Sequence, residues 1–151
     1  MKLILPLQKF NRNNVIYTNR TKNNIMDGDF YRLYYSDEIA SFNGVTLYFK
    51  LNKVNVLKYF KKYKITFNWA ENHVVLNLLV NLEKNILDAF EGKVKMKNKH
   101  ILDQITNGFL KIISPNELQY GSRDTFNLQL KISGIWESEN ECGLTFRFFS
   151  L

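Results

Sequence analysis

Lysine and arginine side chains alternate with aromatic and apolar residues in several short segments of this sequence. In "VTLYFKL" (45–51) the odd positions are apolar and form one face of an extended chain, so Tyr48 and Lys50 project from the other face. A cation so placed neutralises a phosphate, and an aromatic ring beside it stacks on an unpaired base whatever the identity of that base. The pattern therefore predicts a surface that binds a single-stranded nucleic acid.

The same arrangement recurs in other segments. One face of "DFYRLYY" (29–35) combines rings with a cation, and "YKITFNW" (63–69) leaves its polar residues outside. Residues 128–133 and 144–149 each expose a cation, and "KVKMKNK" (93–99) places lysines at strict alternation, on one side of an extended segment. We predict that nucleic acid is bound by Arg32, Tyr34, Tyr48, Lys50, Lys64, Lys93, Lys95, Lys131, Arg147 and Phe149. For a single ring such as Tyr34 or Tyr48, the alternative is an ordinary place in the wall of a barrel.

The charge of the chain is positive and unevenly distributed. The formal net charge is +7 and the isoelectric point is about 9.4. No aspartate or glutamate occurs in residues 1–26 or 39–70, whereas the acids gather in "DGDF", "SDE" and "ESENE". Basic segments of this kind favour polyanionic partners, because phosphate contacts release counterions. The alternative is that the lysines only solvate the surface.

Groups that could support catalysis are few. A nuclease could use neighbouring carboxylates to hold Mg²⁺, and Asp27, Asp29, Asp37 and Glu38 are close in sequence. Nothing positions them, since Asp27 and Asp29 flank Gly28 as in a turn. The sequence contains no phosphate-binding glycine loop, zinc-protease motif or serine-hydrolase motif. We therefore predict a protein that is not an enzyme and has no catalytic residues, no metal and no cofactor.

One cysteine and two histidines set further limits. Cys142, His73 and His100 cannot supply a disulfide framework or a four-ligand zinc site. We expect a structural cysteine whose pKa is raised by Glu141, and two solvated histidines. The longest apolar run, "VVLNLLV", is too short to span a membrane. An intracellular location and no membrane partner are therefore expected.

The elements expected to position these residues are mostly strands. Period-two alternation predicts strands at 29–35, 45–51, 63–69 and 108–114. A helix is predicted at 72–91, with Val75, Leu78, Leu79, Leu82, Ile86, Ala89 and Phe90 on its core stripe and Gly92 as its C-cap. Strands interrupted by one helix predict a mainly β chain with an antiparallel barrel of about five strands, the OB-fold plan. We expect one domain, 1–151, in which residues 8–27 form a loop.

A hairpin is predicted from 126 to 148. Phe126, Leu128, Leu130, Ile132, Gly134 and Trp136 fall on one face of its first strand, and Leu144, Phe146 and Phe148 on one face of its second. The segment "ESENECG" (137–143) between them is polar, and Gly143 is expected to supply an unusual turn conformation.

This hairpin resembles the C-terminal strand pair of single-stranded DNA-binding proteins of nucleocytoplasmic large DNA viruses and, more remotely, of podophages. The likeness rests on "KISGIW" (131–136), Gly143 and "LTFRF" (144–148), about a fifth of the chain; "FYRLYY" and "GVTLYFKL" fit loosely. It implies an OB-fold that coats single strands in replication, recombination or repair. The podophage proteins end in an acidic tail that recruits polymerase and helicase, whereas this sequence ends at "RFFSL", so the likeness does not extend to that tail.

Three hypotheses follow for the function. The leading one is a non-catalytic protein that coats single-stranded DNA with little sequence specificity. The second is a regulatory module that binds RNA or duplex through the same basic surface. The third is a viral structural or assembly protein that forms homo-oligomers through exposed edges and aromatic faces. A viral protein is expected at the sites of viral replication in the host cell.

Overall fold

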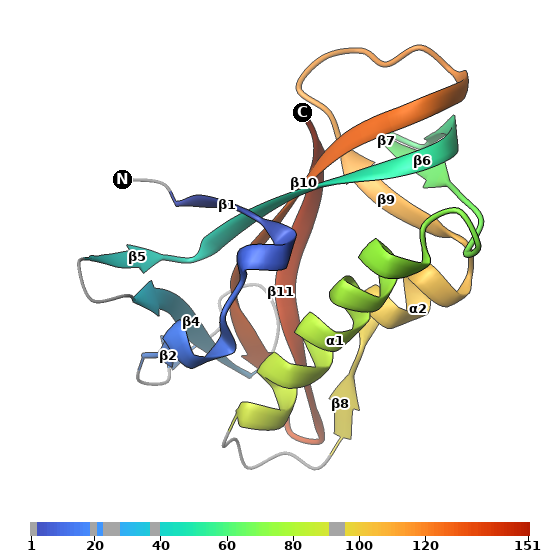
Figure 1. Cartoon of the computed structure of the whole chain (residues 1–151). Helices are drawn as coiled ribbons and strands as arrows, with labels where there is room; N and C mark the ends of the chain where they lie inside the picture. Colours follow the sequence, from blue (N-terminus) through green and yellow to red (C-terminus); the bar gives the residue numbers. More distant parts are fainter. Residues whose placement is uncertain (1–2, 19–20, 23–27, 37–39, 91–95) are drawn as a thin grey trace.

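A ring of five strands forms the main body of the computed structural model, which describes residues 3–18, 21–22, 28–36, 40–90 and 96–151 (Figure 1). In hydrogen-bonded order the ring consists of β6 (Val45–Tyr59), β7 (Lys62–Thr66), β9 (Phe109–Ile113), β11 (Glu141–Ser150) and β10 (Gly121–Glu137), which pairs back onto β6. The predicted five-stranded barrel of OB type is thereby confirmed. If the five barrel strands are numbered by their order in the sequence, their order around the ring is 1-2-3-5-4. Its third and fifth strands, β9 and β11, are parallel, and the other neighbours are antiparallel.

The barrel interior is filled by alternate apolar residues of every strand. Alternation on β6 buries Leu47, Phe49 and Leu51, and then shifts at Lys53, whose φ is 51°, so that Val54 and Val56 point inward. β6 pairs with β10 from Val45 to Val56, in a register that does not change at Lys53, and with β7 from Asn55 to Tyr59. Each fully buried Leu or Ile contributes about 1.5–3 kcal/mol. The remaining barrel core comprises Ile65, Leu110, Ile112, Phe126, Leu128, Leu130, Ile132, Leu144 and Phe148.

The predicted helix is confirmed as α1 (His73–Ala89), which contacts β6 and β11 of the barrel. Its buried stripe differs slightly from the predicted one. Leu79, Leu82 and Ile86 are buried as expected, but Leu76 and Leu87 are buried too, whereas Leu78 is exposed. Gly92, the predicted C-cap, lies outside the described residues.

A second helix, α2 (His100–Thr106), was not predicted and accounts for the changed stripe, because α1 packs on it as well as on the barrel. Glu83 of α1 joins the two helices. Its buried carboxylate accepts hydrogen bonds from the backbone N–H groups of Ile101 and Leu102, at 2.9 and 3.0 Å. A side chain 18 and 19 residues away from the two donors thus satisfies the first turn of α2.

β10 extends beyond the barrel and carries a second group of strands, here called the wing. The wing consists of β2 (Val15–Tyr17), β3 (Thr21–Lys22), β4 (Asp29–Ser36) and β5 (Ser41–Asn43), and β4 pairs with β10 at Gly134–Glu137. Figure 1 shows the wing on the side opposite the β6–β7 hairpin. The predicted strand at 29–35 therefore exists but belongs to the wing. Two short strands, β1 (Ile4–Pro6) and β8 (Met96–Asn98), pair in parallel with β6 and β11.

The register of β10 shifts between Ile132 and Gly134, and this corrects one predicted face. Before the shift the even residues are buried as predicted; after it Ile135 and Glu137 are buried, and Trp136 is only half-buried. One extra residue in a strand moves all following side chains to the other face.

Two smaller predictions were wrong. Gly143 lies within β11 opposite Trp136, and the turn is Ser138–Asn140, with Ser138 N–H bonded to the Glu141 carbonyl at 2.8 Å. Trp69, which falls on the apolar face of the strand predicted at 63–69, is 48% exposed because β7 ends at Thr66. In the described part of residues 8–27, where a loop was predicted, the chain forms the end of one short 3-10 helix, η1 (Leu7–Lys9), a second, η2 (Arg12–Asn14), and the strands β2 and β3.

Candidate nucleic-acid interface

Four cations lie side by side across the outside of the barrel, and we call them the cation row. They are Lys131 of β10, Arg147 of β11, Lys111 of β9 and Lys64 of β7. Lys131 pairs with Arg147, and Lys111 pairs with Lys64. Between these pairs β11 and β9 are in parallel register at Phe148–Ile112 and Phe149–Ile113. Continued by one residue toward the start of both strands, this register sets Arg147 opposite Lys111. Strands about 4.8 Å apart make this a row of roughly 15 Å.

The four charges have no carboxylate partner among the described residues. Like charges on adjacent strands repel one another, so the row is unfavourable unless an anion binds to it. Residues 121–132 of β10, which form part of the barrel, contain one acidic residue, Asp124. It lies near the start of the strand, seven residues before Lys131. β6, β7 and β9 contain no acid at all.

Aromatic rings hold two of the three lysines of the cation row, Lys64 and Lys111, in place. Lys64 Nζ lies 4.0 Å from the centroid of the Phe109 ring, and Lys111 Nζ lies 4.9 Å from that of Tyr59. Each such contact is worth about 0.5–1 kcal/mol at a partly exposed site and leaves the charge available to a phosphate. The rings therefore order the cations without neutralising them.

A second row of outward residues lies beside the cation row and contains Tyr48, Gln129, Phe149 and Ile113. Three of these residues line a hollow of about 320 Å³, together with Lys131 of the cation row. We call it the Phe149 hollow; its remaining lining residues are Thr46, Pro115 and Ser150. A half-buried ring beside an exposed cation is the combination that binds a base and its phosphate together.

The structure brings five of the ten predicted binding residues together. Lys64, Lys131 and Arg147 belong to the cation row, and Tyr48 and Phe149 belong to the row beside it. Tyr48 is 43% exposed, which agrees with an outward position.

The other five predicted residues are not part of this group. Arg32 donates to Asn43 Oδ1 at 3.1 Å, and Tyr34 pairs with Ile16 and Asn43 within the wing. Lys50 borders a separate hollow at the start of α1. The last two predicted residues, Lys93 and Lys95, lie outside the described residues.

Three residues of the site were missed in the sequence: Lys111, Phe109 and Tyr59. The signal for Lys111 and Phe109 was present, because they alternate with Leu110 and Ile112, which are buried. Their position beside Lys64 depends on the pairing of β7 with β9, across a separation of more than 40 residues.

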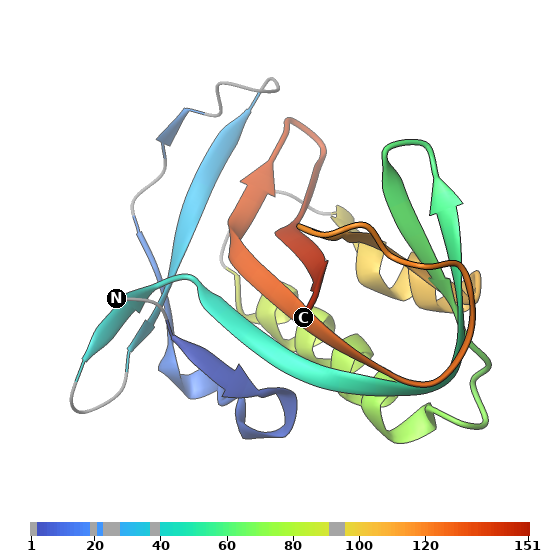
Figure 2. The same cartoon turned by 90° about the horizontal axis from the view of Figure 1, so that it is seen from above.

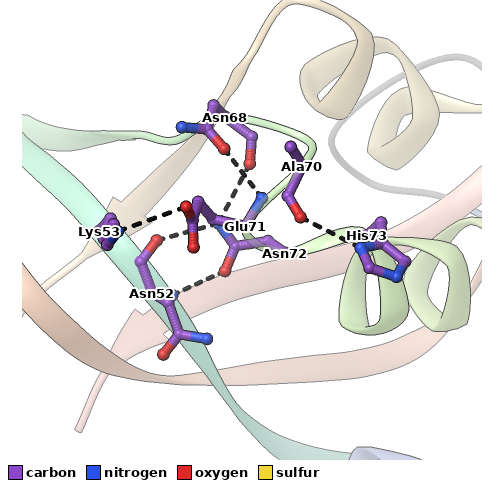
Figure 3. A network of polar contacts seen from close by, with 7 residues as sticks. All are labelled: Asn52, Lys53, Asn68, Ala70, Glu71, Asn72 and His73. Atoms are coloured by element: carbon purple, nitrogen blue, oxygen red, sulfur yellow. Dashed lines mark hydrogen bonds and ion pairs between the residues drawn. The ribbon is translucent and has the colours of Figure 1, made fainter.

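The polar residues at the start of α1 have a structural role. Figure 3 shows Asn72 between two segments: its Oδ1 accepts from Asn52 N–H at 2.7 Å, and its Nδ2 donates to the carbonyls of Asn52 and Asn68. His73 Nδ1 contacts the carbonyl of Ala70 at 3.1 Å. Asn72 thus fixes α1 against the bend of β6.

Candidate catalytic groups are dispersed. No three His, Cys, Asp or Glu side chains come together as a metal site in the part of the chain that the structure describes, and of the four neighbouring carboxylates only Asp29 is described. Burial raises the pKa of the Cys142 thiol, and Glu137 raises it further. None of the described helices is long and apolar enough to cross a membrane.

No protein family model, curated protein or solved structure matches this chain. Its function is therefore argued from the geometry and charge of the barrel surface.

Proposed function

We propose that this protein binds single-stranded DNA through the cation row and the Phe149 hollow, without catalysis and with little sequence specificity. The observation that carries the proposal is a row of four cations, none of which has a carboxylate partner in the described part of the chain, beside a half-buried ring on an outer barrel face. Phosphates would lie along the cation row, and a base would stack on Phe149.

A single strand fits this surface better than a duplex. The aromatic ring of Phe149 lies in a hollow, so only a base free of its neighbours can reach it. Outer faces of OB barrels, in particular the second and third strands, are a common place for oligonucleotides; here these strands are β7 and β9, which carry Lys64 and Lys111.

The resemblance to viral single-stranded DNA-binding proteins supports the same proposal. Its residues, "KISGIW" and "LTFRF", fall on β10 and β11, the strands that contribute Lys131 and Arg147. We therefore propose a role in coating single strands during viral replication, recombination or repair.

The test is fluorescence anisotropy with a labelled oligo(dT) of about thirty nucleotides over a salt series, with duplex and RNA competitors. Each phosphate contact contributes about −0.7 to the slope of log K against log salt on a single strand. Four contacts predict a slope of about −3 from the cation row. Arg147→Gln should reduce the magnitude of the slope of log K against log salt by about 0.7. Lys84→Gln on the exposed face of α1 is the matched control and should leave it unchanged.

The outcomes separate the alternatives. Absence of binding at low salt, or an equal effect of Lys84→Gln, would remove the cation row as a DNA site. Displacement of oligo(dT) by RNA or duplex at lower concentrations than by single-stranded DNA would favour the regulatory module instead.

A further inference from the structure

The turn between β6 and β7 places a phenylalanine where hairpins favour glycine. Phe60 and Lys61 are the two central residues, since Tyr59 pairs with Lys62. Phe60 has a φ of 54°, whereas Lys61 has a negative φ. Turns with a positive φ at the first central residue carry glycine there, because a bulky side chain is strained in this conformation. A strained residue that persists at an exposed position points to a function.

The side chain of Phe60 is 84% exposed, more than any other large apolar side chain in the described part of the chain. Its ring meets the ring of Tyr59 edge-on, with centroids 5.0 Å apart. The Tyr59 ring is itself covered by Lys64 and Lys111, whose Nζ atoms lie 5.7 and 4.9 Å from its centroid. The tip of the β6–β7 hairpin, residues 59–62, is therefore held in place by the contacts of Tyr59 with Lys64 and Lys111, whereas the Phe60 side chain extends into solvent.

Three exposed lysines lie within two residues of Phe60 in the chain: Lys58, Lys61 and Lys62. None of them pairs with a carboxylate in the described ranges. A partner must therefore be anionic and must offer an apolar, flat surface to the ring. Through Lys64 and Lys111 the tip is continuous with the cation row, so the same polyanion can reach both. Figure 2 shows this hairpin, in green, at the edge of the barrel and away from the wing.

We propose that Phe60 is a wedge that enters the last base step of a duplex where it adjoins a single strand, and holds that step open. Apolar side chains inserted between base steps unstack them in this way. The lysines at the tip would hold the phosphates of the junction, and the cation row would take the released strand. This activity, opening duplex DNA from a junction, rests on the proposed function and goes beyond coating a strand that is already single.

The test uses a forked duplex with 2-aminopurine in the pair next to the fork, whose fluorescence rises when the base unstacks. The wild-type protein should raise the signal. Phe60→Gly relieves the strain and is expected not to lower Tm. It should bind oligo(dT) as the wild type does and open the fork about tenfold less, as expected for the loss of one base–aromatic stack.

Lys53→Gly is the matched control, because Lys53 is the other described non-glycine residue with a positive φ, at 51°. It should open the fork like the wild type. An inactive Lys53→Gly with normal Tm would show that strain relief at β6, rather than the Phe60 ring, governs opening, and would overturn the wedge.

The remaining outcomes distinguish the wedge from the proposed function. If the wild type does not bind oligo(dT), both fail. If it binds and Phe60→Gly opens the fork equally well, the wedge fails and the proposed function stands. A folded Phe60→Gly that loses oligo(dT) binding would make Phe60 an ordinary stacking residue. In a last outcome, the wild type does not open the fork but sediments with anionic phospholipid vesicles, and Phe60→Gly does not sediment with them. This result would assign Phe60 to binding a membrane surface and would also overturn the wedge.

Discussion

Phe149 and Arg147 are alternate outward residues of one strand, and their roles can be separated by substitution. Phe149→Ala should weaken oligo(dT) binding by about 1–3 kcal/mol, the usual contribution of one base–aromatic stack. It should change the salt slope little, because no phosphate contact is lost. Anisotropy measures both quantities. Tyr34→Ala in the wing is the control, and an equal loss of affinity there would contradict the assignment of the base to Phe149.

The buried carboxylate of Glu83 stabilises the fold away from the barrel face. Glu83→Ala should lower the free energy of unfolding by about 3 kcal/mol, because two backbone N–H groups at the start of α2 lose their acceptor. Urea denaturation followed by circular dichroism measures this loss. Lys84→Ala, next to it on the exposed side of the helix, should change stability by less than about 0.5 kcal/mol.

The same residue predicts a dependence of stability on pH. Burial raises the pKa of Glu83 above its ordinary value, although its two hydrogen bonds act in the opposite direction. The folded state therefore takes up the proton more readily than the unfolded state does. The stabilisation from this difference is fully present below the unfolded pKa and is lost as pH rises through the folded pKa. Relative to Glu83→Gln, the wild type should lose stability as pH increases over that range. The measurement is urea denaturation of both proteins at each pH. A free energy of unfolding that changes with pH by the same amount in the wild type and in Glu83→Gln would refute this.

At the scale of elements, β10 links the barrel to the wing at a glycine that admits no side chain. A Cβ on Gly134 would lie 2.2 Å from the Tyr31 carbonyl oxygen and 2.7 Å from the Phe30 ring. Gly134→Ala should therefore push β4 from β10 and destabilise the protein by more than about 3 kcal/mol. Thermal denaturation tests this, with Ser133→Ala as the neighbouring control. A Tm equal to that of the control would show that the wing pairs with β10 more loosely than the structure indicates.

Period-two alternation was sufficient to locate β4 and the five barrel strands, since burial alternates along β9 and along β6 as far as Leu51. It did not locate the short strands β1, β2, β3, β5 and β8. Alternation could not locate the register shift at Ser133 of β10. This shift occurs where β10 begins to pair with β4, a strand about 100 residues earlier in the chain. The seven residues of α2 were missed because their first turn is satisfied by Glu83, on another helix. Gly143 was taken for a turn residue, whereas its role is to admit the Trp136 ring, 2.8 Å from where a Cβ would stand.

Five residues of the candidate site were predictable from the sequence, but their arrangement was not. Lys64, Lys131 and Arg147 were identified one by one from the face on which they lie. The row they form with Lys111 results from the strand order, in which β11 lies between β9 and β10. Alternation within one segment carries no information on which segments become neighbours. The strained Phe60 likewise follows from the tight closure of β6 on β7.

At the scale of the whole molecule, unpaired positive charge on the barrel opposes association of bare copies. We expect the protein without nucleic acid, at low ionic strength where this repulsion is not screened, to show no large assemblies by light scattering after gel filtration, and to assemble only along a DNA strand. A homo-oligomer remains a prediction of the assembly hypothesis. Large particles that form without DNA and persist in high salt would favour that hypothesis over strand coating.

The reactivity of the single cysteine, Cys142, reports on local opening of the folded protein. Cys142 is 1% exposed, lies on β11 between β8 and β10, and has a thiol pKa raised by burial. A thiol-specific reagent can react only in molecules where β8 or the end of the hairpin has transiently separated. The rate of modification in native buffer therefore counts local opening events directly, without a label or a mutation, at the place where the wing and the barrel share a strand.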